Sequence, residues 1–208
     1  MFKSRLSKFV LALALVLPLA AAAKEAGEPK SGEGRQFLAG RFLIASPQMG
    51  DPRFAETVIY MIAHDSNGAF GLVVNRVLGE GTLASFLKGF GIESPAAKGR
   101  IRVHYGGPVE PGRGFVLHTG DYKAEHTTVV SGQVSMTTEL DVLKAIGEGN
   151  GPRRSIFALG YAGWGPGQLE GELARGDWLT APADEGILFD DTFEDKWERA
   201  RRKAGMPL

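Results

Sequence analysis

Seven short runs rich in β-branched and aromatic residues follow one another along the chain, and several of the segments between them are too short for a crossover helix. Such runs are typical of strands. Parallel neighbours need a crossover connection of a dozen or more residues, so short connections favour antiparallel pairing. The sequence therefore predicts a mixed, mostly antiparallel sheet. The runs are Phe37–Ala45, Thr57–Ala63, Ala69–Asn75, Ile101–Tyr105, Gly114–His118, Thr127–Val134 and Ser155–Gly160.

Turn and helix signals complete the pattern. Residues 65–68, Asp-Ser-Asn-Gly, predict a hairpin between the second and third runs. Four segments have apolar residues at helical spacing. Thr82 is the expected N-cap of the first helix and Gly91 its stop, whereas Thr138 with Asp141 predicts a capping box for the second. The four predicted helices are Leu83–Phe90, Leu140–Ile146, Pro166–Ala174 and Phe193–Ala204. We therefore predict an α+β fold with about four helices.

The first residues differ from the rest of the chain. Three bases precede an apolar run, Phe9–Ala23, that ends in alanines. This order is typical of a secretory signal peptide, and the run is short for a membrane span. We predict a signal peptide over 1–23, a flexible linker over 24–36 and one domain over 37–208, with no stable membrane span after cleavage. An exported, periplasmic protein is expected; an uncleaved anchor is the alternative.

Composition excludes several classes of function. The chain has 208 residues and no cysteine, which rules out thiolate catalysis, iron–sulfur clusters and disulfides. Its 24 basic and 24 acidic residues balance, but the predicted signal peptide holds three of the bases, Lys3, Arg5 and Lys8. The remainder has 21 bases against 24 acids, so a nucleic-acid partner is not expected.

The most distinctive segment is Gly160–Glu170. Pro166 suits the first helical position after an N-cap at Gly165, and Trp164 with Leu169 has the spacing of a hydrophobic staple. The alternative interpretation is that the glycines expose a helix N-terminus to a small anion or to a protein partner's carboxylate. The staple is preferred because it accounts for both apolar residues without a ligand.

Other motifs are weaker. Gly79, Gly81 and Ala84 form part of a dinucleotide-binding pattern, but the preceding strand belongs to a hairpin, so no cofactor is predicted. The four histidines, His64, His104, His118 and His126, lack the spacing of a zinc motif, so no metal is predicted. No catalytic residue is assigned.

Ordered blocks of the sequence together resemble the YqgE/AlgH family. They are residues 44–54, 58–61, 71–76, 105–109, 113–118 and 160–170, followed by the region of Trp178. The resemblance implies a compact α+β domain with a partly closed sheet surrounded by helices. It implies no established activity, and it would place the protein in the cytoplasm. The residues that match the family pattern, and are candidates for a shared binding surface or for shared turns and core, are Asp51, His64, Asn75, Gly107, His118, Tyr161, Trp164, Gln168 and Glu170.

Three hypotheses of function remain open. The leading one is a non-enzymatic binding or regulatory module that contacts a protein or a small anion at the Trp164 loop. The second is a small enzyme in which His64, Asp65 and His118 converge. The third is a transcriptional regulator, which rests on the family name alone and conflicts with a signal peptide.

Overall fold

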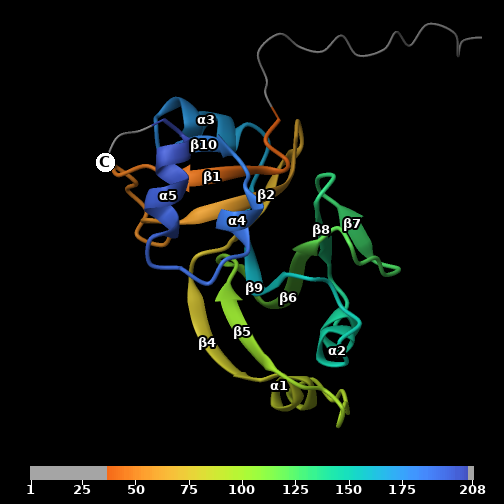
Figure 1. Ribbon diagram of the computed structural model, residues 1–208. Coiled ribbons are helices and arrows are strands. Elements are labelled where there is room, and N and C mark those ends of the chain that lie inside the picture. Colours follow the sequence, from red (N-terminus) through yellow and green to blue (C-terminus); the bar gives the residue numbers. More distant parts are fainter. Residues whose placement is uncertain (1–36, 206–208) are drawn as a thin grey trace, which may run out of the picture. The chain divides into compact units, whose positions relative to one another are not determined.

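The computed structural model describes residues 37–205, so the predicted signal peptide and linker lie outside the described residues. This part of the chain holds ten strands and five helices (Figure 1). The strands are β1 (Arg41–Ala45), β2 (Val58–Asp65), β3 (Gly68–Val73), β4 (Val77–Thr82), β5 (Arg100–Tyr105), β6 (Val109–Thr119), β7 (Thr127–Val129), β8 (Val134–Thr137), β9 (Ser155–Trp164) and β10 (Trp178–Pro182). The helices are α1 (Leu83–Gly89), α2 (Asp141–Gly147), α3 (Gln168–Ala174), α4 (Glu185–Leu188) and α5 (Lys196–Lys203).

Strand β9 is the branch point of the sheet. The strand order is β10-β1-β2-β3-β9-β6-β8-β7, and the β4–β5 pair joins β9 from outside this path. The last residues of β9 pair with β3, whereas its first residues pair with both β5 and β6. The β5–β9 pair is parallel and all other pairs are antiparallel. The predicted α+β class with a mixed, mostly antiparallel sheet is confirmed.

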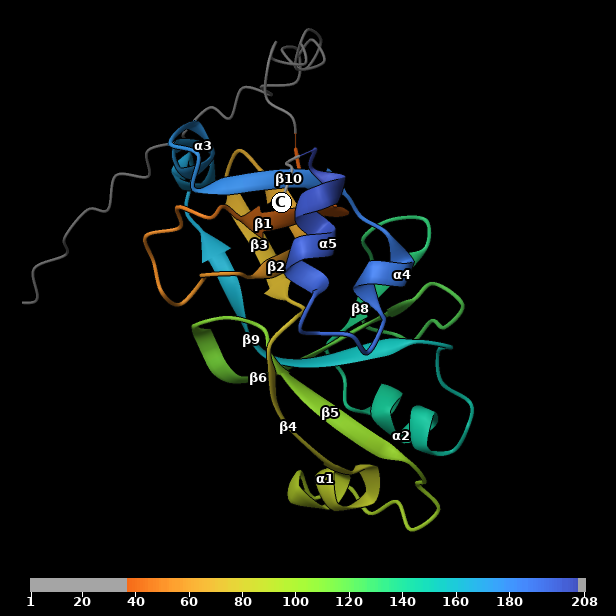
Figure 2. The same ribbon diagram turned by 60° about the vertical axis from the view of Figure 1, so that its left-hand side comes forward.

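Helices cover the two ends of this sheet. Strands β10, β1, β2 and β3 lie with α3, α4 and α5, whereas β4 and β5 extend away from them toward α1 (Figures 1 and 2). Helix α5 is fixed to the sheet because the Trp197 indole N–H donates to the carbonyl oxygen of Ala45 in β1, at 2.8 Å. No helix within residues 37–205 is both long enough and apolar enough to span a membrane.

Both faces of β1 and β2 are buried. Phe42 and Ile44 of β1 belong to one apolar cluster, and Leu43 and Ala45 belong to a second one on the opposite face. Alternating side chains of a strand point to opposite faces, so this sheet region needs cover on both sides. The α3 residue Leu169 supplies part of that cover. Strands that are buried on both faces have continuous apolar runs in the sequence, as β1 and β2 do.

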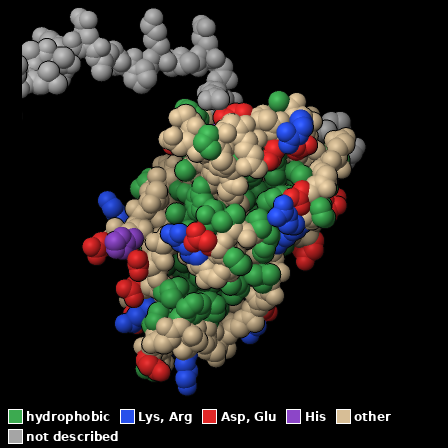
Figure 3. Space-filling view, turned by 180° about the vertical axis from the view of Figure 1, so that it is seen from behind, with side chains coloured by type: hydrophobic (Ala, Val, Ile, Leu, Met, Phe, Trp, Pro, Cys, Tyr) green, Lys and Arg blue, Asp and Glu red, His purple; other side chains and the backbone are tan. Residues whose placement is uncertain are grey.

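A third apolar cluster lies where α1 and α2 meet β5, β6 and β9. Its buried members are Leu83, Leu87, Ile101, Val116, Val142, Leu143 and Phe157. The surface is not uniformly polar, since the face opposite the view of Figure 1 shows areas of hydrophobic side chains separated by charged groups (Figure 3).

Local signals predicted some elements correctly and others wrongly. The β2–β3 hairpin is present, and Asn67 N–H donates to Asp65 in its turn, at 2.7 Å. Thr82 caps α1 as predicted, by accepting from Ser85 N. The predicted cap at Thr138 is wrong, because α2 begins after Leu140 without a side-chain cap. The predicted run Thr127–Val134 divides into β7 and β8, which face each other across a turn.

Three elements were not predicted from the sequence. Strand β4, helix α4 and strand β10 all lie in segments without a clear apolar pattern, such as Val-Leu-Gly-Glu-Gly-Thr in β4. Gly79 and Gly81 therefore belong to a strand that pairs antiparallel with β5, and the dinucleotide-like spacing has no strand-to-helix loop. The Lys196 side chain, at the start of α5, is fully buried.

Glycines allow the chain to cross itself beside β9. A Cβ on Gly106 would lie 2.2 Å from the carbonyl oxygen of Gly160, and a Cβ on Gly107 would lie 2.1 Å from the carbonyl carbon of Tyr161. Gly160 itself has φ +71°, a conformation that favours glycine. The two segments therefore touch backbone to backbone.

We expect Gly107→Ala to destabilise the domain by about 3 kcal/mol or more, because the added methyl meets main-chain atoms that cannot rotate away. Gly112→Ala is the matched control in β6, since nothing lies within 4 Å of its Cβ position; its effect should stay within about 0.5 kcal/mol. Urea unfolding of both variants measures the difference, and equal stabilities would contradict the backbone contact.

Candidate functional site

A cavity of about 380 Å³ contains several of the predicted site residues, and we call it the tryptophan pocket. It lies between the loop before β2, the end of β9, helix α3 and the start of β10. Asp51, Trp164 and Gln168, three of the nine candidate residues, line it. The other lining residues are Met49, Gly50, Arg53, Phe54, Pro108, Val109, Gly163, Glu172, Arg175, Asp177 and Trp178.

Glu172 organises the polar side of this pocket. One carboxylate oxygen accepts from the indole N–H groups of Trp164 and Trp178, each at 2.8 Å, and the other accepts from Gln168 Nε2 at 3.0 Å. Two rings and one helix are thus joined at a single carboxylate. Sequence reasoning missed Glu172, although Gln168 and Glu172 stand four residues apart and share a helix face.

Trp164 has a structural role at this site. It is 7% exposed and shares an apolar cluster with Leu169, but the two residues do not occupy the predicted staple positions, because the N-cap is Gly167 and not Gly165. Helix α3 begins later than predicted, at Gln168, behind an N-cap Gly167 in the left-handed conformation. The Gln168 side chain accepts from Gly165 N–H at 3.1 Å, which completes the turn between strand and helix.

The charges at the rim of the tryptophan pocket are paired locally. Arg53 lies 2.7 Å from Asp51, and Arg175 lies 2.8 Å from Asp177. Hydrogen bonds from the Arg53 side chain hold the pKa of Asp51 below its ordinary value. Each arginine thus already has a carboxylate partner, so neither offers an unpaired positive charge to a ligand.

His64 and Glu170 lie close to each other, away from Asp51. The Leu38 N–H donates to His64 Nδ1 at 3.2 Å, and His64 Nε2 lies 3.5 Å from a Glu170 carboxylate oxygen. The buried imidazole therefore joins the chain before β1 to helix α3. This is a contact between elements rather than a group open to substrate.

His118 lies in a different environment from His64. Its Nδ1 is 2.8 Å from the carbonyl oxygen of Thr119 and must donate, so in the neutral ring Nε2 accepts from the Thr137 hydroxyl at 2.9 Å. Burial lowers the pKa of His118 and favours this neutral form. No hydrogen bond or ion pair among the described residues links it to His64 or Asp65.

Asn75, Gly107 and Tyr161 hold backbone segments together. The Asn75 side chain accepts from Val58 N at 2.9 Å and donates to the Glu56 carbonyl at 2.8 Å, which fixes the loop before β2. The Tyr161 ring packs against Phe70 with ring centres 4.8 Å apart. These matches to the family pattern therefore have structural explanations.

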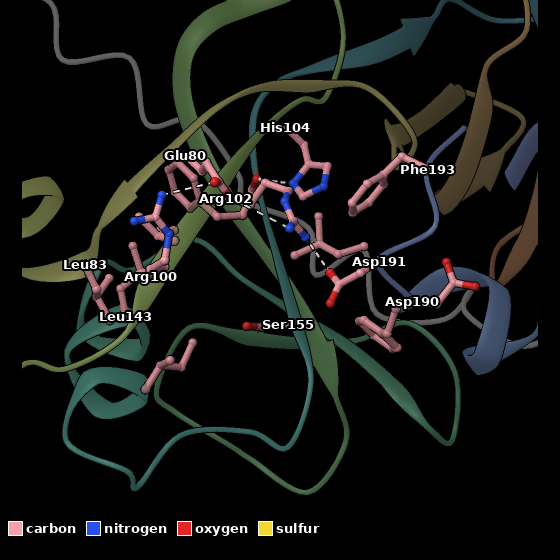
Figure 4. Close-up of a pocket in the computed structure, with 15 residues that line it drawn as sticks. Glu80, Leu83, Arg100, Arg102, His104, Leu143, Ser155, Asp190, Asp191 and Phe193 are labelled. Carbon is pink, nitrogen blue, oxygen red and sulfur yellow. Dashed lines mark hydrogen bonds and ion pairs between the residues drawn. The ribbon is translucent and has the colours of Figure 1, made fainter. Parts of the chain in front are cut away.

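A second cavity, of about 330 Å³, was not predicted, and we call it the arginine–histidine pocket (Figure 4). Arg100, Arg102 and His104 reach it from alternate positions of β5, which share one strand face. That alternation was readable from the sequence. The remaining lining residues are Glu80, Leu83, Ile101, Leu143, Ile146, Ser155, Ile156, Phe157, Phe189, Asp190, Asp191 and Phe193.

Carboxylates compensate the two arginines of this pocket. Glu80 lies 3.0 Å from Arg100 and 3.7 Å from Arg102. Arg102 also pairs with Asp191, and its guanidinium carbon lies 4.8 Å from the centre of the Phe193 ring. Figure 4 shows Arg102, His104 and Phe193 grouped on one side of the pocket.

His104 is 3% exposed, and its ring centre lies 5.3 Å from that of Phe193. Its Nδ1 lies 3.1 Å from the Phe157 carbonyl oxygen, while Nε2 is buried without a hydrogen-bond partner among the described residues. Burial lowers the pKa of His104 to about 4. The ring is therefore neutral at pH 7, with the proton on Nδ1 and a lone pair on Nε2.

Within residues 37–205, no group of three or more His, Asp or Glu side chains is placed to hold a metal ion. The fold and its two pockets thus define a small α+β protein built on one branched, mixed sheet, with ligand-sized cavities at the ends of β9. The chain belongs to the AlgH-like family (DUF179), whose pattern matches residues 42–208.

Relatives and solved structures agree with this assignment. A UPF0301 protein of Methylococcus capsulatus is 47% identical over 86% of this chain and 98% of its own length, and one of Rhodospirillum rubrum is 49% identical over 82% and 88%. The solution structure of the AlgH protein from Pseudomonas aeruginosa matches with a TM-score of 0.71 and 42% identity, covering 88% of this chain and 94% of that one. These names state no reaction, and the family is uncharacterised in function.

We expect Trp164→Ala to cost about 3–5 kcal/mol of stability, because it removes a buried ring and leaves a cavity. Trp164→Phe keeps a buried ring but loses the hydrogen bond to the Glu172 carboxylate, so about 1.5–3 kcal/mol is expected. Thermal unfolding measures both. A Trp164→Ala variant as stable as the wild type would contradict the structural role of this side chain.

Proposed function

We propose that the protein is a non-enzymatic binding module, in which the tryptophan pocket receives an uncharged side chain from a protein partner. The observation that carries this proposal is the chemistry of the pocket lining. Met49, Phe54 and Trp164 offer apolar contact, and a cavity of about 380 Å³ is large enough for an aromatic or branched side chain.

The arrangement of charge supports a side chain rather than a small anion. Both rim arginines have carboxylate partners, and Glu172 adds a negative charge that accepts from the two indoles and Gln168. An anion would have to displace Asp51 or Asp177, whose side chains are only 32% and 29% exposed. An uncharged group meets no such competition, and loop residues Gly165–Gly167 are exposed beside the pocket for main-chain contacts.

The contacts of the histidines support a binding role rather than catalysis. His64 and His118 contact separate backbone and side-chain partners, and general acid–base catalysis needs such groups within reach of one substrate. We propose that the protein acts by binding and regulating this partner.

The test is to fill the pocket without disturbing the fold. Nothing lies within 4 Å of a Cβ placed on Gly50, so Gly50→Tyr adds a ring at the pocket lining without strain. We expect this variant to fold normally and to recover at least about tenfold less of a cross-linked partner from the native host, which corresponds to about 1.4 kcal/mol of lost affinity.

Gly89→Tyr is the matched control, because Gly89 also has free space at its Cβ position and lies at the end of α1, outside the tryptophan pocket. It should recover the partner as well as the wild type does. Equal recovery with both variants would disprove the proposed site. If Gly50→Tyr instead abolishes phosphate binding followed by NMR, the ligand is an anion and not a protein.

We also propose that the protein is exported, which is supported by the bases and the apolar run before residue 24. An exported protein would find its partner in the cell envelope, not on the chromosome. Cell fractionation with N-terminal sequencing is expected to give a mature start near Lys24 in the exported fraction. An intact Met1 in the cytoplasm would refute export and would favour a cytoplasmic regulator.

A further inference from the structure

The arginine–histidine pocket holds a buried hydrogen-bond acceptor that the protein does not use. The Phe157 carbonyl can only accept, so it fixes the His104 proton on Nδ1, and Nε2 keeps its lone pair. That nitrogen is buried and has no partner among the described residues. Buried polar atoms are nearly always hydrogen-bonded, and an unpaired one carries its full desolvation cost. A ligand with an O–H or N–H group would satisfy it.

The buried cation Lys196 makes its hydrogen bonds elsewhere. Lys196 Nζ has three protons, and it lies 3.0 Å from the Leu188 carbonyl, 3.2 Å from the Asp190 carbonyl and 3.3 Å from an Asp190 carboxylate oxygen. Lys196 thus makes two hydrogen bonds to carbonyl oxygens and an ion pair with Asp190, and no hydrogen bond among the described residues joins it to His104. A ligand is therefore the donor we consider for His104.

The arginine end of the pocket already binds a carboxylate. Asp191 pairs with Arg102, yet the Asp191 side chain is 83% exposed. An exposed ion pair of this kind contributes little, so a ligand carboxylate can replace it at small cost. Asp191 thus marks where an external carboxylate would lie and competes with it for Arg102.

The surface between these two polar ends is apolar and partly aromatic. Leu83, Leu143 and Ile146 reach it from α1 and α2, and Phe157 and Phe193 add rings. Arg102 already stacks on Phe193, so a flat ring can extend this stack. Ligand sites typically combine such an apolar lining with few convergent polar groups, and about 330 Å³ lies at the small end of their volumes.

From this geometry we propose that the arginine–histidine pocket binds a small aromatic carboxylic acid that carries a hydroxyl or N–H group opposite its carboxylate. The carboxylate lies on Arg102 in place of Asp191, the ring lies against Phe193, and the hydroxyl or N–H donates to His104 Nε2. This site is separate from the tryptophan pocket and does not depend on the function proposed there.

The probe is 4-hydroxybenzoate, titrated into the full chain at pH 7 and compared with benzoate and 4-hydroxybenzamide. Benzoate lacks the donor for His104, and the amide lacks the charge for Arg102. We expect each to bind about tenfold or more weakly than 4-hydroxybenzoate, the effect of one lost hydrogen bond or ion contact. Calorimetry measures the affinities. Equal affinities, or no binding of 4-hydroxybenzoate at millimolar concentration, would overturn the proposal.

The second readout follows His104 directly and needs no variant. The ¹⁵N resonance of His104 Nε2 should shift when 4-hydroxybenzoate binds, because the lone pair then accepts a proton donor, and it should shift much less with benzoate. An unchanged Nε2 resonance at saturating 4-hydroxybenzoate would show that the ligand, if bound, does not use His104.

The Asp191→Asn variant tests the proposal through a gain of affinity. Removing the competing carboxylate should tighten 4-hydroxybenzoate binding several-fold, and the exposed position makes unfolding of this variant unexpected. Glu194→Gln is the matched control, since it removes one negative charge from the same segment and Glu194 is exposed and outside the pocket. Equal gains in both variants would indicate a general charge effect and would refute the competition at Arg102.

Discussion

The close approach of two backbone segments at three glycines determines most of this structure. Gly106 and Gly107 lie against Gly160 and Tyr161 so tightly that no side chain fits between them. At this crossing β9 leaves β5 and β6 and continues beside β3. A Cβ at any of the three positions would separate the segments, and the branched sheet would then lose its junction.

Both pockets follow from the same strand. Ser155–Phe157 at the start of β9 line the arginine–histidine pocket, and Gly163 with Trp164 at its end line the tryptophan pocket. A ten-residue strand extends on the order of 30 Å at 3.3 Å per residue. The pockets are therefore separate sites on one strand. Each depends on β9 for a wall, since the Phe157 carbonyl bonds His104 and the Trp164 indole bonds Glu172.

Local chemistry predicted the elements that carry their own signal. The Asp65–Gly68 turn and the Thr82 cap need only neighbouring residues, and both are present. Strand β4 was missed because its side chains are mostly exposed and two of its residues are glycines, so no apolar alternation marks it. The start of α3 was placed too early because Gly167 adopts the left-handed conformation, which ends any helix begun at Pro166. The end of β9 was also placed too early, because its pairing with β3 is a long-range contact that no local pattern encodes.

The candidate sites also combine locally predictable features with long-range contacts that the sequence does not reveal. The arginine–histidine pocket is the clearest case. The alternation of Arg100, Arg102 and His104 on one strand face is a local pattern. The opposite wall, however, is formed by the segment before α5. The buried Lys196 amine holds this segment through hydrogen bonds to the Leu188 and Asp190 carbonyl oxygens and an ion pair with the Asp190 carboxylate. Desolvation lowers the pKa of Lys196, whereas the nearby Asp190 carboxylate raises it. The buried ammonium therefore depends on Asp190 and on its carbonyl acceptors. Lys196 thereby fixes the segment in which Phe193 packs on His104. Asp191 in the same segment stays exposed, so a ligand carboxylate can replace its contact with Arg102 at a small cost in free energy.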